Sequence, residues 1–326
     1  MSLYPLKFET IYKEKIWGGQ KIKSVLGKDY GVLNNCGETW EISGVEGNIS
    51  IVAEGVLTGK DLKSLIDQYK DDLVGEKVYR QFGNEFPLLI KFIDANADLS
   101  IQVHPDDVLA RKRHNSFGKT EMWYIMQADE GATLISGFNQ EVTKEDYLKY
   151  FNNGSLSEIL NVEKVSSDDV YFLPAGRVHT IGKGLLVAEI QQTSDITYRI
   201  YDFDRKDADG NKRALHTEQA LDAIDFRFYS HYKTSYHDQI NEAIRLVDCQ
   251  YFTTNKLTLN KPLWRDYSAL DSFVIHICLE GSGTIKTEDG YLCEIKIGDS
   301  ILMPASYNSV DIVPDGNLKL LETYVP

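Results

Sequence analysis

The segment Leu99–Pro105 (LSIQVHP) carries two side chains that can donate electron pairs to a metal ion, Gln102 and His104. The segment alternates apolar and polar residues, as a half-buried β-strand does. Because successive side chains on a strand point to opposite faces, Ser100, Gln102 and His104 are predicted to share one face. Pro105 lacks a backbone N–H and is expected at the end of the strand. The pattern therefore predicts a strand that presents two donor groups to one side.

Two further donor residues lie downstream in a strand-like run and after a turn. Glu121 opens the apolar run 121–126, and His179 follows the turn Pro174-Ala175-Gly176. A buried amide and a buried imidazole need polar partners, and a metal ion would satisfy both. Two imidazoles, one carboxylate and one amide oxygen form a ligand set that suits zinc and also tolerates other first-row divalent ions. We therefore predict that one divalent ion is bound by Gln102, His104, Glu121 and His179.

Each of these residues taken alone is better explained as an ordinary structural group, because buried polar side chains usually have protein partners. The alternation around QxH, together with Glu121 and the PxGxxH turn, is what favours a metal site. The remaining histidines are not accompanied in the sequence by other donor residues in such a pattern, and they are assigned to the surface or the core by default: His114, His216, His231, His237 and His276.

The elements that must position these residues are mostly strands. Short runs of Val, Ile, Tyr, Phe and Leu alternate with Gly, Asn and Asp turns, which is typical of an antiparallel barrel or sandwich. The fold class is therefore predicted to be mainly β with a few short helices. Helical spacing predicts helices over residues 60–73 and 144–151 and from Thr217, and Thr143 is expected to cap the second of them.

The chain changes character around residues 231–242, where we place a domain boundary. The prediction is a metal-binding barrel with helical insertions over residues 1–235. A smaller barrel without a metal site is predicted over residues 236–326.

A weak internal repeat supports two barrels. Residues 168–179 (DDVYFLPAGRVH) align with residues 298–309 (GDSILMPASYNS), so that Ser309 takes the place of His179. If the two segments are equivalent strands and turns, the first copy keeps a metal ligand and the second has lost it. The repeat therefore predicts a two-barrel protein with a single metal site.

Acidic residues outnumber basic ones, and the formal net charge is -14 at pH 7. Such a field repels nucleic acid and anionic membrane surfaces, so neither is expected as a partner. It would also repel a phosphorylated metabolite, which must then be met by a few local Lys or Arg side chains. No apolar run approaches a membrane span, residues 1–17 do not resemble a signal peptide, and the four cysteines form no CxxC pair. A cytoplasmic monomer or weak homo-oligomer is expected.

An ordered series of motifs resembles the type I mannose-6-phosphate isomerases, which are zinc enzymes of the cupin superfamily, and particularly their short bacterial form. The resemblance spans nearly the whole chain and rests on IWGG (residues 16–19), GETW (37–40), FPLLIKFI (86–93), SIQVHP (100–105), GKTEMWY (118–124), PAGRVH (174–179) and EIQQTSDITYR (189–199). An ordered set of this kind is more specific than any one motif. It implies two cupin-type jelly-roll barrels and an enzyme that interconverts mannose 6-phosphate and fructose 6-phosphate.

The resemblance also implies roles for individual residues. The four residues predicted above to bind a metal would hold one zinc ion. The sugar phosphate would be surrounded by Trp17, Glu38, Lys91, Ser100, Lys119, Glu189 and Arg199. Aldose–ketose isomerisation moves a proton between neighbouring carbons through an enediol, so Arg199 would stabilise negative charge while Glu189 or Lys119 transfers the proton. Lys119 is equally a candidate for phosphate binding, and Lys91 for local positive charge.

Several departures affect the substrate prediction more than the metal prediction. The large helical domain of the long form is reduced to short helices, Ile181 stands where long-form relatives have an aromatic residue, and Asp168 replaces a glycine that usually begins the second cupin motif. Taken singly, Lys91 and Lys119 could also be ordinary surface lysines. Glu189 and Arg199 could likewise form a structural ion pair with each other.

Two other functions remain open at this point. Two histidines and a carboxylate are also the iron ligands of a metal-dependent cupin oxygenase, although Gln102 as a fourth ligand argues against the open positions that it needs. A sugar-binding or regulatory cupin without turnover is the second alternative. The charged residues Lys119, Glu189 and Arg199 argue against a barrel that only binds.

Overall fold

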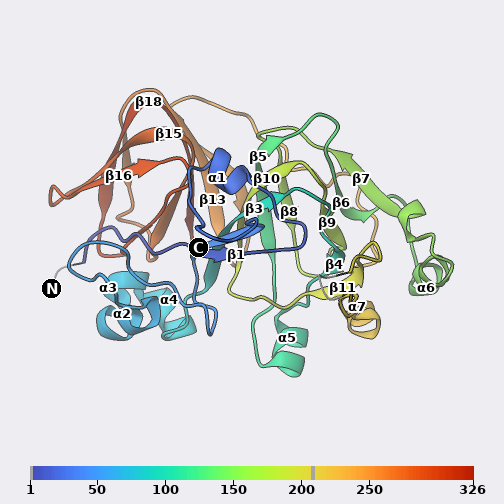
Figure 1. The fold of residues 1–326 in the computed structure, drawn as a ribbon. Coiled ribbons are helices and arrows are strands. Elements are labelled where there is room, and N and C mark those ends of the chain that lie inside the picture. Colours follow the sequence, from blue (N-terminus) through green and yellow to red (C-terminus); the bar gives the residue numbers. More distant parts are fainter. Residues whose placement is uncertain (1–2, 207–209) are drawn as a thin grey trace.

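The computed structural model describes residues 3–206 and 210–326, whose strands form three sheets of antiparallel neighbours (Figure 1). The first sheet has the order β1 (Ile11–Lys13), β2 (Glu38–Ile42), β3 (Leu88–Ala95), β10 (Leu185–Gln192), β5 (Glu121–Ala128) and β8 (Val170–Leu173). The second has the order β11 (Tyr198–Tyr201), β4 (Ile101–Val103), β9 (His179–Ile181), β6 (Thr133–Phe138) and β7 (Leu160–Lys164). The third has the order β12 (Ala243–Asp248), β13 (Thr253–Leu259), β18 (Ser309–Tyr324), β15 (Val274–Thr287) and β16 (Leu292–Lys296), with β14 (Leu263–Asp266) on β18 and β17 (Ser300–Met303) on β15. The prediction of a mainly β fold is confirmed.

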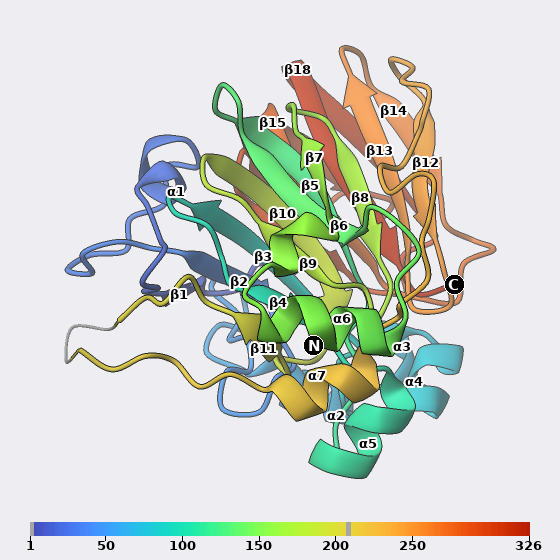
Figure 2. The same ribbon diagram turned by 90° about the vertical axis from the view of Figure 1, so that its right-hand side faces the viewer.

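The helices are short, and Figure 2 shows that most of them gather at one end of the strands. They are α1 (Lys21–Ser24), α2 (Leu62–Tyr69), α3 (Asp71–Val74), α4 (Glu76–Phe82), α5 (Asp107–His114), α6 (Lys144–Asn152), α7 (Thr217–Ala223) and the 3₁₀ helix η1 (Leu156–Glu158). Within the described ranges, no helix has the length and apolar character needed to span a bilayer.

Two of the predicted helices are confirmed. The helix expected over residues 144–151 is α6, and its first turn is closed by a capping box between Thr143 and Asp146. The helix expected from Thr217 is α7.

The helix predicted over residues 60–73 is wrong in its extent, because the chain breaks it into α2 and α3. Lys70, between the two helices, has a φ of 48° and ends α2. Asp71 then opens α3, and an acidic side chain in the first turn interacts favourably with the helix dipole.

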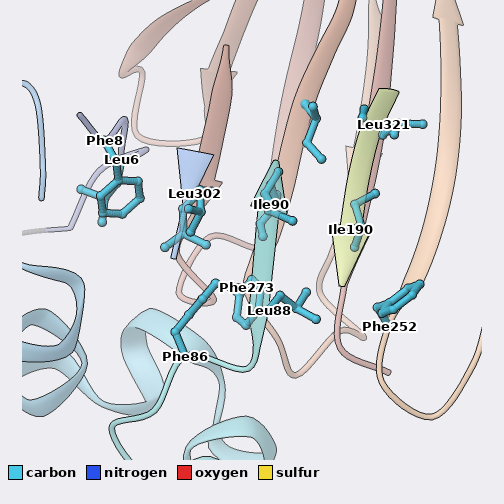
Figure 3. Packing of buried hydrophobic residues seen from close by; sticks show 14 of the residues in the cluster. Leu6, Phe8, Phe86, Leu88, Ile90, Ile190, Phe252, Phe273, Leu302 and Leu321 are labelled. Carbon is cyan, nitrogen blue, oxygen red and sulfur yellow. The ribbon is translucent and has the colours of Figure 1, made fainter. Parts of the chain in front are cut away.

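The strands of the first sheet carry two different faces. Trp123 and Val187 share a buried cluster with Ile181 of the second sheet, so one face looks into the sandwich between these sheets. The alternate residues, such as Ile190, pack instead against Leu321 and other residues of the third sheet (Figure 3). Because the two halves of the chain share this cluster, the predicted division at residues 235/236 stays a prediction.

The predicted internal repeat appears as matching pairs of strands. In the first copy β8 leads through Pro174 to β9, and in the second β17 leads through Pro304 to β18. His179 and Ser309 are each the first residue of the second strand of the pair. The two pairs of strands are placed differently, because β8 and β9 lie in different sheets whereas β17 and β18 both pair with β15, so the equivalence of the two segments stays a prediction.

The fold makes a stability prediction at Ile190, which is fully buried between the first and third sheets. Ile190→Ala is expected to lower the free energy of unfolding by about 2–5 kcal/mol, because removing the side chain leaves a cavity, and Ile190→Val by about 0.5–1.5 kcal/mol. Urea denaturation measures both. The matched control is Val162→Ala on β7, where the side chain is 57% exposed and a loss under about 1 kcal/mol is expected. An equal loss at the two positions would contradict the two-layer packing of β10.

Candidate metal centre

A row of side chains crosses the first sheet at the level of the candidate site. The strand register aligns Trp40, Lys91, Glu189 and Trp123 on the neighbouring strands β2, β3, β10 and β5. Residues in register on neighbouring strands point to the same face of a sheet. That face looks toward the second sheet, because Trp123 packs with Ile181 of β9. The row therefore places Lys91 and Glu189 inside the sandwich.

A second row on the opposing sheet supplies the other half of the site. Arg199 on β11 lies opposite Gln102 on β4, and Gln102 lies opposite His179 on β9. His104 follows β4 directly, and its carbonyl accepts a hydrogen bond from Gly176 N (2.9 Å). The turn that leads to His179 is thereby attached to the end of the strand that carries His104 and Gln102.

The four predicted metal ligands come together between the two sheets. His104 Nε2 lies 3.5 Å from Glu121 Oε2, and His179 Nε2 lies 3.3 Å from Glu121 Oε1. One donor atom from each of these three buried residues fits within 4.8 Å of the others. The amide Nε2 of Gln102 lies 3.3 Å from His179 Nε2, and a half-turn of this amide would present its oxygen instead.

Backbone carbonyls fix the tautomer of both imidazoles. His104 Nδ1 lies 2.9 Å from Ile196 O, and His179 Nδ1 lies 2.8 Å from Arg177 O. A carbonyl oxygen can only accept a hydrogen bond, so the proton of each ring is on Nδ1. Each Nε2 therefore carries a lone pair that faces Glu121, as a metal-binding imidazole requires.

The buried polar atoms of this cluster are not satisfied by the protein. Within the described residues, both oxygens of Glu121 and Nε2 of His104 are buried and accept no hydrogen bond. Burial, followed by repulsion from Glu189, raises the pKa of Glu121 to about 8. Burial lowers the pKa of His179 to about 4 and that of His104 well below its ordinary value. Unpaired buried acceptors are costly, and a divalent cation would satisfy all of them, so the donor set fits such an ion.

A cavity of about 320 Å³ opens beside the cluster. It is lined by all seven residues that the sequence placed around a sugar phosphate, namely Trp17, Glu38, Lys91, Ser100, Lys119, Glu189 and Arg199, and by Gln102. A neighbouring cavity of about 340 Å³ shares Asp195 with it but is lined by none of the four predicted ligands. The structure thus brings every predicted site residue to one place.

Two carboxylates of the cavity, those of Glu189 and Glu38, are paired with cations. Glu189 Oε2 lies 3.0 Å from Lys91 Nζ, and its Oε1 accepts a hydrogen bond from Trp123 Nε1 (2.9 Å). Burial opposes ionisation of Glu189, but the ammonium groups of Lys91 and Lys119 outweigh it and lower its pKa. The alternative reading of Glu189 with Arg199 as an ion pair is wrong, because Glu189 pairs with Lys91.

Glu38 is ionised for a similar reason. Burial alone would raise its pKa, but Lys91 and Lys15 lower it to about 2. Lys15 Nζ lies 3.2 Å from Glu38 Oε1, and Trp40 Nε1 donates to Glu38 Oε2 (2.9 Å). Lys91 and Lys119 are only 4% and 5% exposed, so neither is a surface lysine.

The sequence predictions missed several residues of the cavity wall. These are Lys15, Trp40, Ile93, Leu99, Trp123, Ile181, Asp195, Thr197 and Arg213. Trp40 and Trp123 lie inside motifs that had been singled out, so their type was a usable signal. Arg213 lies in a polar stretch whose sequence predicts an ordinary surface turn. Its guanidinium is held by Asp202, which accepts hydrogen bonds from Arg213 Nε (2.7 Å) and Nη2 (2.5 Å). Among the residues that the structure describes, five basic side chains thus line the cavity, compared with three acidic ones.

Comparison with known proteins finds one family along the chain. Residues 5–142 match the family model for the phosphomannose isomerase type I catalytic domain, and residues 242–325 match the mannose-6-phosphate isomerase cupin domain. The chain is 36% identical over 310 residues to the mannose-6-phosphate isomerase ManA of Bacillus subtilis (strain 168), covering 93% of this chain and 94% of that protein. It is 34% identical over 325 residues to the mannose-6-phosphate isomerase of Streptococcus mutans, covering 98% of each.

Solved structures of phosphomannose isomerases also match the fold of this chain. The crystal structure of the mannose 6-phosphate isomerase from Bacillus subtilis matches with a TM-score of 0.87 at 34% identity, covering 98% of this chain and 99% of that chain. A mutant phosphomannose isomerase from Salmonella typhimurium, at 16% identity and a TM-score of 0.81 over 98% of this chain and 99% of that chain, shares the fold. The predicted cupin-type fold is confirmed.

The donor set predicts that metal binding depends on individual imidazoles. His104→Ala and His179→Ala are each expected to lower the bound metal from about one ion per chain to nearly none, because a site of this kind needs its full ligand set. Elemental analysis after loading with zinc and gel filtration measures this. His231→Ala, at an exposed histidine, is the matched control and should keep the metal. Full retention of zinc by both site variants would rule out this centre.

The raised pKa of Glu121 predicts a pH dependence. Below a pKa of about 8 the carboxyl of the metal-free protein carries a proton that a cation must displace, whereas both histidines are already neutral at neutral pH. The apparent affinity for zinc should therefore fall about tenfold for each pH unit between pH 7.5 and 6. Competition with a chelator of known proton affinity measures the slope. Glu121→Gln should bind more weakly and without this slope, and an equal slope in the variant would assign the proton elsewhere.

Proposed function

The chain belongs to the type I phosphomannose isomerases, and we propose that it interconverts mannose 6-phosphate and fructose 6-phosphate with one zinc ion held by Gln102, His104, Glu121 and His179. The observation that carries the proposal is the position of an unsatisfied two-histidine, one-carboxylate cluster beside a cavity whose described lining residues carry surplus positive charge. A cytoplasmic location and a monomeric or weakly oligomeric state stay predictions.

The reaction sets the demands on the site. An aldose phosphate and a ketose phosphate interconvert when a proton leaves the carbon next to a carbonyl and returns to the neighbouring carbon, through an enediol. A bound zinc ion would supply a Lewis acid for the oxygen on which charge develops. The protein must hold the phosphate, stabilise the remaining negative charge and move the proton.

The cations of the cavity meet the first demand. The net charge of the chain would repel a sugar phosphate, but Lys15, Lys91, Lys119, Arg199 and Arg213 outnumber the carboxylates that line the cavity. A locally positive cavity concentrates an anionic substrate even when the rest of the surface repels it. This supports a phosphorylated substrate over a neutral sugar.

Arg199 is the proposed stabiliser of negative charge. It lies on β11 opposite the ligand Gln102, and its Nη1 donates to Ala214 O (2.9 Å), which fixes the guanidinium. Its Nε is buried and makes no hydrogen bond within the described residues, so the guanidinium keeps one donor without a protein partner. Burial lowers the pKa of Arg199, but a guanidinium stays ionised at working pH.

We assign proton transfer to Lys119 rather than to Glu189. Both oxygens of Glu189 already have partners, Trp123 and Lys91, and its lowered pKa makes it a weak base. Lys119 Nζ lies 3.4 Å from Glu121 Oε2, so it stands next to the position of the metal and lines the cavity. In this assignment Glu189 holds Lys91 and Trp123 in place, and Lys119 acts as acid and base.

A coupled assay of the zinc-loaded protein with mannose 6-phosphate tests the proposal. Arg199→Ala should keep its zinc but lose about 100- to 1000-fold in kcat, as expected when a group that stabilises transition-state charge is removed. His104→Ala should lose metal and turnover together. Binding of the sugar phosphate without turnover would favour a receptor, and oxygen consumption by an iron-loaded sample would favour an oxygenase. Activity of metal-free His104→Ala at the wild-type rate would refute the proposal.

A further inference from the structure

The carboxylate of Asp107 is shared by three donors from distant parts of the chain. Its Oδ1 accepts hydrogen bonds from Gly118 N (2.8 Å) and Gln192 Nε2 (3.0 Å), and its Oδ2 accepts one from Tyr251 OH (2.8 Å). Asp107 is the first residue of α5, but the helix is capped by the preceding Asp106. The carboxylate of Asp107 is therefore available to tie other segments together.

These bonds surround Lys119. Lys119 N donates to Pro105 O (3.0 Å), and Thr120 N donates to the side-chain oxygen of Gln192 (2.9 Å). With the bond from Gly118 N, three successive amides around Lys119 are held by fixed acceptors. The backbone at Gly118 is so close to α5 that a Cβ there would lie 2.6 Å from Asp107 N. The segment that carries Lys119 is thus locked against the start of α5.

The third donor comes from the C-terminal barrel. Tyr251 lies in the turn between β12 and β13, and the next residue, Phe252, is fully buried in the cluster shared by the two halves of the chain (Figure 3). Tyr251 itself packs against that cluster. The bond from Tyr251 OH to Asp107 therefore connects the rigid third sheet to the support of Lys119.

We propose that Asp107 is a positioning residue for Lys119, and that through Tyr251 the C-terminal barrel is part of this support. The inference rests on the proposed role of Lys119 in proton transfer. A misplacement of about 1 Å can cost a hundredfold in rate, so a second barrel that fixes a turn next to the metal contributes to turnover without touching substrate.

Two matched Tyr→Phe substitutions, each of which removes one hydroxyl group, test the inference in the zinc-loaded full chain. Tyr251→Phe removes the hydroxyl that donates to Asp107 and keeps the aromatic ring. Tyr236→Phe is the control, because Tyr236 is also partly buried and its phenol donates to Asp168 O (2.7 Å) instead. Tyr251→Phe should lower kcat about tenfold with KM changed less than about threefold and zinc content unchanged, whereas Tyr236→Phe should leave kcat within about twofold. Equal losses of kcat in the two variants would overturn the inference.

Amide hydrogen exchange provides a readout that does not depend on turnover. The peptide covering residues 116–122 should exchange faster in Tyr251→Phe than in wild type, and at the wild-type rate in Tyr236→Phe, because only the first change loosens Asp107. Unchanged exchange in Tyr251→Phe would refute the positioning role whatever the activity.

A double-mutant cycle separates this inference from the proposed function. If Tyr251 acts through Lys119, Tyr251→Phe should lower kcat much less in a Lys119→Gln background than in wild type. A full tenfold loss in that background would contradict the inference. Absence of isomerase activity in the wild type would instead refute the proposed function, and hydrogen exchange would still decide whether Tyr251 and Asp107 hold the segment. Wild-type activity of Lys119→Gln would refute the role of Lys119 in proton transfer and with it the catalytic part of this inference.

Discussion

Glu121 brings a carboxylate into a fully buried position where neither of its oxygens accepts a hydrogen bond within the described residues. An isolated buried charge is strongly unfavourable, so such a group either takes up a proton or meets a cation. The two histidines beside it point their lone pairs at the same space, because backbone carbonyls hold their other nitrogens. The strands of the two sheets hold these three groups together, with Lys119 Nζ 3.4 Å from Glu121 Oε2 and Gln102 Nε2 3.3 Å from His179 Nε2.

The alternation of the strands makes this arrangement possible. On β10, Glu189 faces the cavity while Ile190 faces the cluster shared with the third sheet. A shift of one residue in the register of such a strand would exchange these two side chains between a polar cavity and an apolar core. The packing of the outer face therefore fixes the side chains of the inner face, and the stability of the core and the geometry of the site depend on the same register.

The third sheet contributes to the site indirectly. Ser309 is aligned with His179 in the predicted repeat, and the cluster of candidate metal donors found among the described residues lies in the N-terminal half of the chain. The C-terminal barrel instead buries one face of the first sheet and, through Tyr251, reaches the turn that carries Lys119. The C-terminal half of the chain thereby supports the half that carries the candidate metal donors.

The sequence by itself predicted the four candidate metal donors and determined the mainly β class and local features such as the capping box of α6, because these depend on residue type and on short-range periodicity. It did not reveal α5, since five of the eight residues of that helix are exposed and they show no apolar stripe, or the break at Lys70. Only the tertiary structure decided that Glu189 pairs with Lys91 and that Arg213, which belongs to a polar stretch of the sequence, lines the cavity. The physical reason is that periodicity tells which face of a strand a side chain takes, whereas long-range pairing of strands decides which side chains meet across that face.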